Sequence, residues 1–250
     1  MKCICRRRFR QDNTLARPLI SWGPKERVDV VVTNPPFGGI EEDSIESNFP
    51  VAFRTRETAD LFLMLIMQLL KNRGRAALVL PDGLLFGEGI KTRIKEKMLK
   101  DCNLHTIVRL PNGVFAPYTG IKTNLLFFSK GTPTQHIWFY EHPYPPGVKS
   151  YNKTKPMKIA EFEAEAAWWG KESDNFSTRV ENQYAWKMSI EDIKARNYNL
   201  DCKNPHIGEQ EIHDPEVLLA QYATMQNDIA ALRGQLKDIL GEALQREVKP

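Results

Sequence analysis

Residues 29–39 read Asp-Val-Val-Val-Thr-Asn-Pro-Pro-Phe-Gly-Gly, and they set the architecture that we expect of the whole chain. The β-branched run from Val28 to Thr33 predicts a fully buried parallel strand. Two prolines can neither continue a ladder nor open a helix interior, so the chain must leave the sheet at Asn34. Pro35 also favours an extended backbone at Asn34. The sequence therefore predicts a stiff loop at the carboxyl end of a strand, where open α/β sheets bind ligands.

The chemistry of this loop suits an exocyclic amino group, which has two N–H donors. The side-chain oxygen of Asn34 and the carbonyl of Pro35 can accept both hydrogen bonds. These bonds would hold the nitrogen lone pair out of the ring's conjugation and aim it at an electrophile. Pro36 would stiffen the loop, and Phe37 can stack on a base flipped from a duplex. The alternative is a proline-rich turn that merely follows a core strand.

At these residues the sequence resembles the N6-adenine and related amino-methyltransferases of DNA, whose motif is [Asn/Asp/Ser]-Pro-Pro-[Tyr/Phe]. Three later segments, in order, resemble the modification (M) subunit of type I restriction–modification systems: Val79–Phe86, Leu104–Phe115 and Gly120–Phe128. The likeness is good over residues 12–130 and loose elsewhere. It implies methyl transfer from S-adenosylmethionine to adenine without a covalent enzyme intermediate. It also implies a set of catalytic residues: Asn34, Pro35, Pro36 and Phe37.

The resemblance implies further site residues. Lys122 and Asn124 would line the target-base pocket or touch the DNA backbone; alternatively they are a solvated lysine and a strand-capping asparagine. Asp12 lies in an acidic turn that would sit near the cofactor adenine or the target, or it is simply a turn former. Asn34 would also border the cofactor.

One part of such an enzyme is missing from the sequence. A complete methyltransferase of this class needs a Gly-rich loop after its first strand for S-adenosylmethionine and an acidic residue after its second strand for the ribose. Neither precedes Asn34, and no later glycines form Gly-x-Gly between a strand and a helix. We therefore expect a C-terminal fragment that begins within a doubly wound domain. A natural truncation and a gene-model artefact are both open.

The expected fold class is α/β, the C-terminal part of a class I (Rossmann-like) methyltransferase sheet followed by a mostly helical extension. A polar loop at 40–57, either a lid or solvated, leads to a buried helix at Ala59–Asn72 that Gly74 ends. Further elements are expected at these positions: strands at Arg75–Pro81, Leu104–Leu110, Gly120–Lys130 and Gln135–Glu141, and an amphipathic helix at Ile90–Leu99. The last two strands are close enough for an antiparallel hairpin about Gly131–Pro133.

We expect four parts along the chain: an irregular basic start at 1–11, the partial catalytic domain at 12–141, a peripheral segment at 142–213 and a long helix at 214–250. The basic start is a phosphate-contacting arm or an incidental translation start. In the last part, apolar residues recur in steps of four and three: Leu218, Tyr222, Met225, Ile229, Leu232, Leu236 and Ile239. This seam predicts contact with another subunit, or packing on its own domain. By the resemblance, the partners are a specificity subunit, a restriction subunit and double-stranded DNA.

Composition agrees with a soluble cytoplasmic protein. The 250 residues are 42% hydrophobic and carry a net charge of +4, which permits nucleic-acid binding. No apolar run is long enough to span a bilayer. The four cysteines form neither a disulfide framework nor a metal-site pattern, which favours a reducing compartment.

The sequence thus predicts an adenine-N6 DNA methyltransferase subunit that is inactive as this fragment. The main alternative is a non-catalytic truncated subunit that acts as an assembly or DNA-binding module. A weaker alternative is an amino-methyltransferase acting on protein or RNA.

Overall fold

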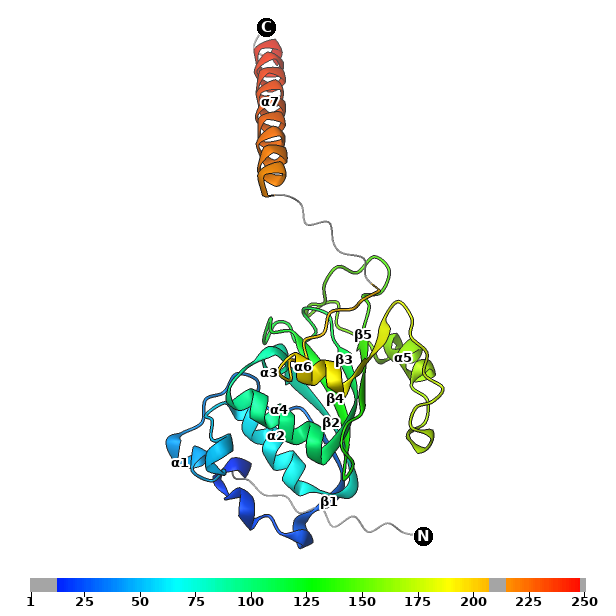
Figure 1. Cartoon of the computed structure of the whole chain (residues 1–250). Coiled ribbons are helices and arrows are strands. Elements are labelled where there is room, and N and C mark those ends of the chain that lie inside the picture. Colours follow the sequence, from blue (N-terminus) through cyan, green and yellow to red (C-terminus); the bar gives the residue numbers. More distant parts are fainter. Residues whose placement is uncertain (1–12, 207–214, 248–250) are drawn as a thin grey trace, which may run out of the picture. The chain divides into compact units, whose positions relative to one another are not determined.

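The computed structural model divides the chain into two units, residues 1–206 and residues 207–250 (Figure 1). A six-stranded mixed sheet forms the centre of the first unit. The structure describes residues 13–206 and 215–247. The basic start at 1–11 and Asp12 therefore lie outside the described residues. The strand order is β1-β2-β4-β3-β5-β6. The strands have these bounds: β1 (Val28–Thr33), β2 (Leu70–Pro81), β3 (Cys102–Arg109), β4 (Thr123–Lys130), β5 (His136–Glu141) and β6 (Ala185–Ser189).

The strand directions determine which strand ends share an edge of the sheet. β1 pairs with β2, and β3 with β5, in parallel. β4 is antiparallel to both β2 and β3, and β6 is antiparallel to β5. Consequently β1, β2, β3 and β5 all run in the same direction, and their carboxyl ends meet at one edge.

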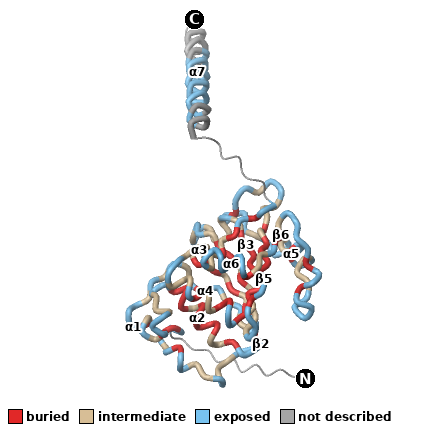
Figure 2. Tube along the Cα trace, in the orientation of Figure 1, coloured by how far each residue is buried: buried red, intermediate tan, exposed pale blue. Residues whose placement is uncertain are grey.

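Helices α2 (Thr58–Leu69), α4 (Ile90–Asp101) and α6 (Ile190–Ala195) cover one face of the sheet and share the main core with it (Figures 1 and 2). Helix α2 is apolar on nearly every side and carries Asp60 in its first turn, so it is buried almost throughout. On the opposite face, α5 (Glu163–Trp168) packs aromatic side chains over β3, β4 and β5. The remaining short helices are α1 (Asp43–Glu46), α3 (Asp82–Phe86) and six 3₁₀ turns: Thr14–Ala16, Leu19–Ser21, Pro24–Glu26, Val51–Phe53, Ile159–Phe162 and Glu172–Asp174.

The predicted hairpin between the strands on either side of Gly131 is wrong, because β4 pairs with β2 and β3 while β5 pairs with β3. The connecting loop crosses the amino end of β3 instead of turning back. Thr134 holds it there: its hydroxyl donates to the Cys102 carbonyl at 2.8 Å and accepts from the Leu104 N–H at 2.9 Å. β4 is also apolar on both faces, which suits an interior position between two strands.

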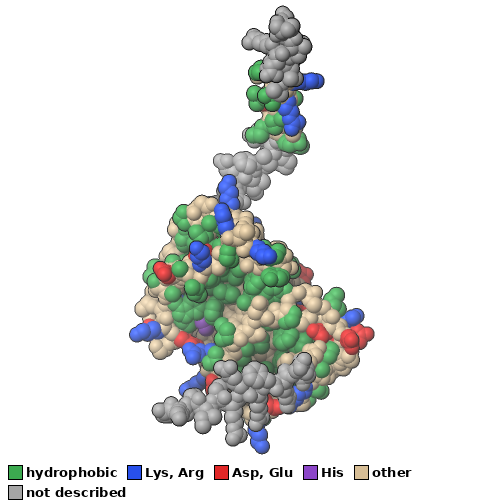
Figure 3. All heavy atoms as spheres, turned by 180° about the vertical axis from the view of Figure 1, so that it is seen from behind, with side chains coloured by type: hydrophobic (Ala, Val, Ile, Leu, Met, Phe, Trp, Pro, Cys, Tyr) green, Lys and Arg blue, Asp and Glu red, His purple; other side chains and the backbone are tan. Residues whose placement is uncertain are grey.

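The prediction that Val28–Thr33 is fully buried is also wrong. β1 is an edge strand among the described residues, and Val28, Val30 and Val32 are 41%, 52% and 78% exposed. Only Val31 on the other face packs against the core under α2. Figure 3 shows hydrophobic side chains gathered on the face opposite the helices. The apolar pattern of the strand is suited to two covered faces, but only one is covered by described residues.

Two boundaries differ from the sequence prediction. Helix α2 ends at Leu69, and β2 already begins at Leu70, so Gly74 lies within the strand. Leu70 pairs with Val28 across the ladder, and Lys71 forms a 2.8 Å ion pair with Asp29, so strand pairing replaces the last helical turn. The polar loop at 40–57 contains α1 and a 3₁₀ turn and buries apolar side chains, so it is packed on the domain.

In the second unit, helix α7 (Pro215–Glu247) occupies the segment in which the four–three spacing predicts a helix. The side chain of Leu218 lies outside the described residues, and the other predicted seam residues are exposed: Tyr222, Met225, Ile229, Leu232, Leu236 and Ile239. None of the helices in the described parts of either unit combines the length and apolar character needed to cross a bilayer.

Candidate functional site

The Asn-Pro-Pro-Phe loop leaves the sheet at the carboxyl end of β1, next to the carboxyl end of β2. Asn34 is exposed, and its side chain makes no hydrogen bond to any described residue. Pro35 is buried and anchors the loop, while its carbonyl also accepts no hydrogen bond within the described part of the chain. Among the described residues, these two neighbouring acceptors are therefore left without a hydrogen-bond donor.

Phe37 is half-buried against a second aromatic ring. Its centroid lies 5.3 Å from that of Phe115, with the ring planes at 84°, an edge-to-face contact. Phe115 comes from the loop that follows β3. The loops that follow β1 and β3 meet at this contact, and the contact holds the Phe37 ring in one orientation.

The backbone behind Phe37 requires glycine at one position. A Cβ at Gly39 would lie 2.5 Å from the Thr58 hydroxyl oxygen. The Gly39 carbonyl accepts from the Thr58 N–H at 3.0 Å, so the loop is clamped on the start of α2. A cavity of about 180 Å³ opens between this loop, the start of α2 and the end of β2.

An ion-pair cluster lies in the wall of this cavity. Lys91 Nζ is 2.8 Å from the Asp60 carboxylate and 2.5 Å from the Glu57 carboxylate. Burial raises the pKa of Asp60, which is only 1% exposed. Burial also lowers the pKa of Lys91, but its hydrogen bonds to Asp60 and Glu57 raise that pKa above its ordinary value. Lys91 is therefore a firmly charged link between α4 and the start of α2.

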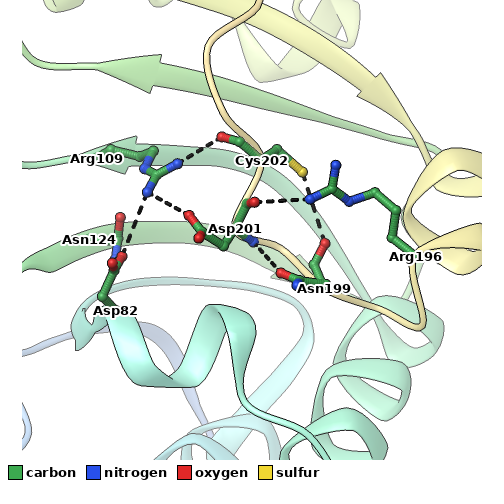
Figure 4. A network of polar contacts seen from close by, with 7 residues as sticks. All are labelled: Asp82, Arg109, Asn124, Arg196, Asn199, Asp201 and Cys202. Carbon is green, nitrogen blue, oxygen red and sulfur yellow. Dashed lines mark hydrogen bonds and ion pairs between the residues drawn. The ribbon is translucent and has the colours of Figure 1, made fainter. Parts of the chain in front are cut away.

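A second polar network joins the ends of three strands and the segment after α6 (Figure 4). Arg109, at the end of β3, donates to Asp201 at 2.6 Å and to the Cys202 carbonyl at 2.7 Å. Its guanidinium also lies 3.9 Å from Asp82, which follows β2. Asn124 donates to the same Asp82 carboxylate at 2.9 Å. Because Arg109 is only 7% exposed, this network is a buried brace at the edge that carries Asn34.

The structure brings most of the predicted site residues to this edge. Lys122 is half-buried, and its carbonyl accepts from the Asp82 N–H at 2.9 Å. Asn124 is fully buried, and its side-chain amide donates to Asp82. Asp12 lies outside the described residues.

Sequence reasoning missed Asp82, Arg109 and Asp201 as members of one network. Asp82 and Arg109 each stand at the carboxyl end of an expected strand, which is a usable signal. Asp201 has no such signal, because its contact with Arg109 spans 92 residues.

The cavity beside the Asn34 loop is small among the cavities of the described residues. The cavity beside Gly39 is about 180 Å³, below the ~300–1,000 Å³ of typical ligand pockets. Gly38 and Gly39 of the Asn34 loop line the cavity, together with Pro81 at the end of β2. Within the described residues no three His, Cys, Asp or Glu side chains gather as a metal site.

Comparison with known proteins gives a consistent result. Residues 5–214 match the family model for N-6 DNA Methylase. The chain is 66% identical over 236 residues to the type I restriction enzyme EcoEI methylase subunit of Escherichia coli. That match covers 94% of this chain but 48% of the relative, so the chain spans about half of the relative's length.

Solved structures agree with this match. A modification subunit of a putative type I restriction enzyme from Vibrio vulnificus YJ016 is 51% identical, with a TM-score of 0.71 over 78% of this chain and 42% of that one. A structure described for complex assembly and conformational transition of the type I R-M system is 36% identical. Its TM-score is 0.75, over 94% of this chain and 49% of that one.

Proposed function

We propose that this chain, which belongs to the N-6 DNA methylase family, forms the target-base part of an adenine-N6 DNA methyltransferase. That enzyme would be a subunit of a type I restriction–modification system. The observation that carries the proposal is the pair of unbonded acceptors, Asn34 Oδ1 and the Pro35 carbonyl, at the shared carboxyl edge of β1 and β2. An amino group with two N–H donors needs two acceptors at one place. A turn that merely ends a strand has no need of two free acceptors there.

The residues of this chain would act by binding and orientation. Asn34 and Pro35 would accept from the adenine amino group and hold its lone pair toward the methyl donor. Phe37, braced by Phe115, would stack on the flipped base. The methyl group would come from bound S-adenosylmethionine. Because Asn34 is uncharged, the amino group would transfer a proton to water or a nearby acceptor after methylation.

The main cofactor loop would come from the part of the protein that this chain does not include. Two observations support this. The described cavity at the site is too small for a cofactor, and no described residue covers the apolar face of the β1 valines or the free edge of that strand. Further strands and helices would cover both.

A second candidate function is a non-catalytic assembly module, and α7 favours it. The described residues of its seam, from Tyr222 to Ile239, recur at a/d spacing, are 43–64% exposed, and have no partner among the described residues. We propose that this seam packs on a helix of another subunit of the system, such as the specificity subunit. The two candidates are compatible, because one concerns the first unit and the other the second.

The experiment that tests the enzymatic proposal supplies the missing part in trans. The region of the E. coli relative outside the 236-residue match would be co-expressed with this chain, and adenine-N6 methylation of duplex DNA would be measured. We expect methylation only when both polypeptides are present. Calorimetry should detect no tight S-adenosylmethionine binding by this chain alone.

Two results would contradict the proposal. Micromolar cofactor binding by the isolated chain would mean that a cofactor site exists within it. Absence of methylation in a complex that does bind the cofactor would leave the assembly function as the better account.

A further inference from the structure

A cavity of about 460 Å³ lies at the edge of the sheet opposite the Asn34 loop. Its floor is formed by residues near the amino ends of β3 and β5, including Asn103 and His136, and one wall is the segment 174–179. The Asn34 loop lies at the carboxyl ends of the parallel strands. The length of the strands therefore separates this cavity from the proposed methylation site.

The cavity is lined by an arginine that is nearly buried and has no acidic partner. Arg179 is 5% exposed, and no carboxylate of the described residues pairs with it. Its Nε donates to the Trp169 carbonyl and one Nη to the Thr106 hydroxyl, both at 2.7 Å. The other Nη has no hydrogen-bond partner and is itself covered from solvent. Burial lowers the pKa of Arg179 to about 10, so the group is still a cation at neutral pH.

Aromatic rings stabilise this cation but do not neutralise it. The guanidinium carbon lies 3.8 Å from the Phe176 ring centre and 4.5 Å from that of Trp168. Phe176 adopts a left-handed backbone with φ of 57°, which is costly for an aromatic residue. The segment 174–179 is thus held in a strained conformation that keeps the Phe176 ring against Arg179.

The rest of the lining supplies a second cation and several neutral donors. Lys187 is exposed, with its ammonium 5.6 Å from the Trp138 ring centre. Thr132 and Ser177 add hydroxyl groups. Asp174 is the single carboxylate in this lining, against two fixed positive charges. The cavity therefore has an excess of positive charge and of hydrogen-bond donors.

We propose that this cavity binds a phosphate group. A buried cation without a carboxylate is normally completed by an anion. A tetrahedral oxyanion accepts from several directions at once, which suits the Lys187 ammonium and the hydroxyl groups of Thr132 and Ser177, beside the buried positive charge of Arg179. Asp174 is an acceptor for a hydroxyl group on the same ligand. The phosphate is carried either by a free nucleotide or by a nucleic-acid backbone.

The test titrates the 250-residue chain separately with inorganic phosphate, AMP and a short DNA duplex at constant ionic strength. The readout is the NMR signal of the Trp138 indole N–H, because that ring contacts the cavity and not the Asn34 loop. Lys187→Met removes the exposed charge but keeps the aliphatic stem over Trp138. Lys203→Met, an exposed lysine outside the cavity, is the matched control.

We expect phosphate, AMP or the duplex to shift the Trp138 signal, with binding weakened about fivefold by Lys187→Met, since a charge-assisted hydrogen bond at an exposed position is worth about 1 kcal/mol. Lys203→Met should bind as the parent does. A response to phosphate and AMP assigns a free nucleotide as the source, and a response to the duplex alone assigns the backbone.

Arg179→Lys provides a second variant that keeps the charge but loses the fork of donors. If it folds, we expect weaker binding than in the parent. The proposal is overturned if no probe shifts Trp138, or if Lys187→Met and Lys203→Met bind equally well. Neither result bears on methyl transfer, because the test does not use the Asn34 loop.

Discussion

Arg109 and Asp201 lie 92 residues apart in the sequence, yet their side chains meet at 2.6 Å. The contact ties the segment after α6 to the carboxyl edge of the sheet. Arg109 reaches Asp82 at 3.9 Å from the same guanidinium, and Asp82 in turn accepts from Asn124. The edge that holds the Asn34 loop is therefore braced by a segment that precedes α7 in the chain.

Removing the acidic partner should destabilise the first unit. Breaking a buried ion pair costs about 3–5 kcal/mol; Asp201 is 33% exposed, so we expect about 2 kcal/mol for Asp201→Ala. Urea unfolding measures this free energy. Lys97→Met is the matched control: it breaks an exposed i,i+4 pair with Asp101 and should cost less than about 0.5 kcal/mol. Equal costs for the two variants would show that the Arg109 brace contributes nothing.

Acid should weaken the fold through His105. Burial, and then the charge of Arg179, lower the pKa of His105 from 6.5 to about 3. The unfolded chain therefore takes up a proton between these values that the folded chain does not. Stability should fall as the pH drops below 6.5, by up to about 1.4 kcal/mol per pH unit from this group.

His105→Phe removes this titration and keeps a ring against Phe176. The difference in unfolding free energy between the parent and this variant isolates the contribution of His105. We expect that difference to be constant above pH 6.5. Below pH 6.5 the parent should lose stability relative to the variant. A difference that is flat down to pH 4 would contradict the burial argument, since ~pH 4 lies well inside the predicted window.

Phe37 should act by stacking, so ring size matters more than its substituents. In the complemented methyltransferase, Phe37→Tyr and Phe37→Trp should keep activity, while Phe37→Ala should lose about 1–3 kcal/mol of base binding. Fluorescence of 2-aminopurine at the target position reports extrusion of the base. Equal signals from the parent and the alanine variant would remove Phe37 from this role.

The exposed seam of α7 should be needed for assembly. Replacing Ile229 and Leu232 with Asp places unpaired charges where a partner helix would pack. We expect co-purification with the specificity subunit to fail while the first unit stays folded. Asn227→Asp with Ala231→Asp adds the same charge on the opposite side of the helix and should keep the complex. Loss of solubility with the complex retained would point to packing within the chain.

The sequence was sufficient to predict the strand and the loop of the site, but not how the strands pair in the sheet. The Val-rich run and two prolines define β1 and its loop, because their constraints are local. The hairpin prediction failed because Thr134 holds the connecting loop across the start of β3, a contact between distant segments. The burial prediction for Val30 and Val32 failed because it assumed a covering layer that the described residues do not provide.

The network at the edge shows the same limit. Asp82 and Arg109 could be suspected from their places at strand ends, but Asp201 could not. Its role depends on where the segment after α6 returns to the sheet, and no local pattern records that. The aromatic contact of Phe37 with Phe115 was equally hidden, because it joins two loops from strands that are not neighbours.

Methyl transfer by Asn34 variants of the complemented enzyme tests the central claim most directly. Asn34→Ala removes one of the two acceptors for the adenine amino group, and loss of such a transition-state hydrogen bond typically costs on the order of 10²–10³ in rate. Asn34 is exposed, so folding should be unaffected, and Asn34→Asp, which keeps an acceptor, should retain more activity. We expect a loss of that size with unchanged thermal stability. Near-normal N6-adenine methylation by Asn34→Ala would contradict it.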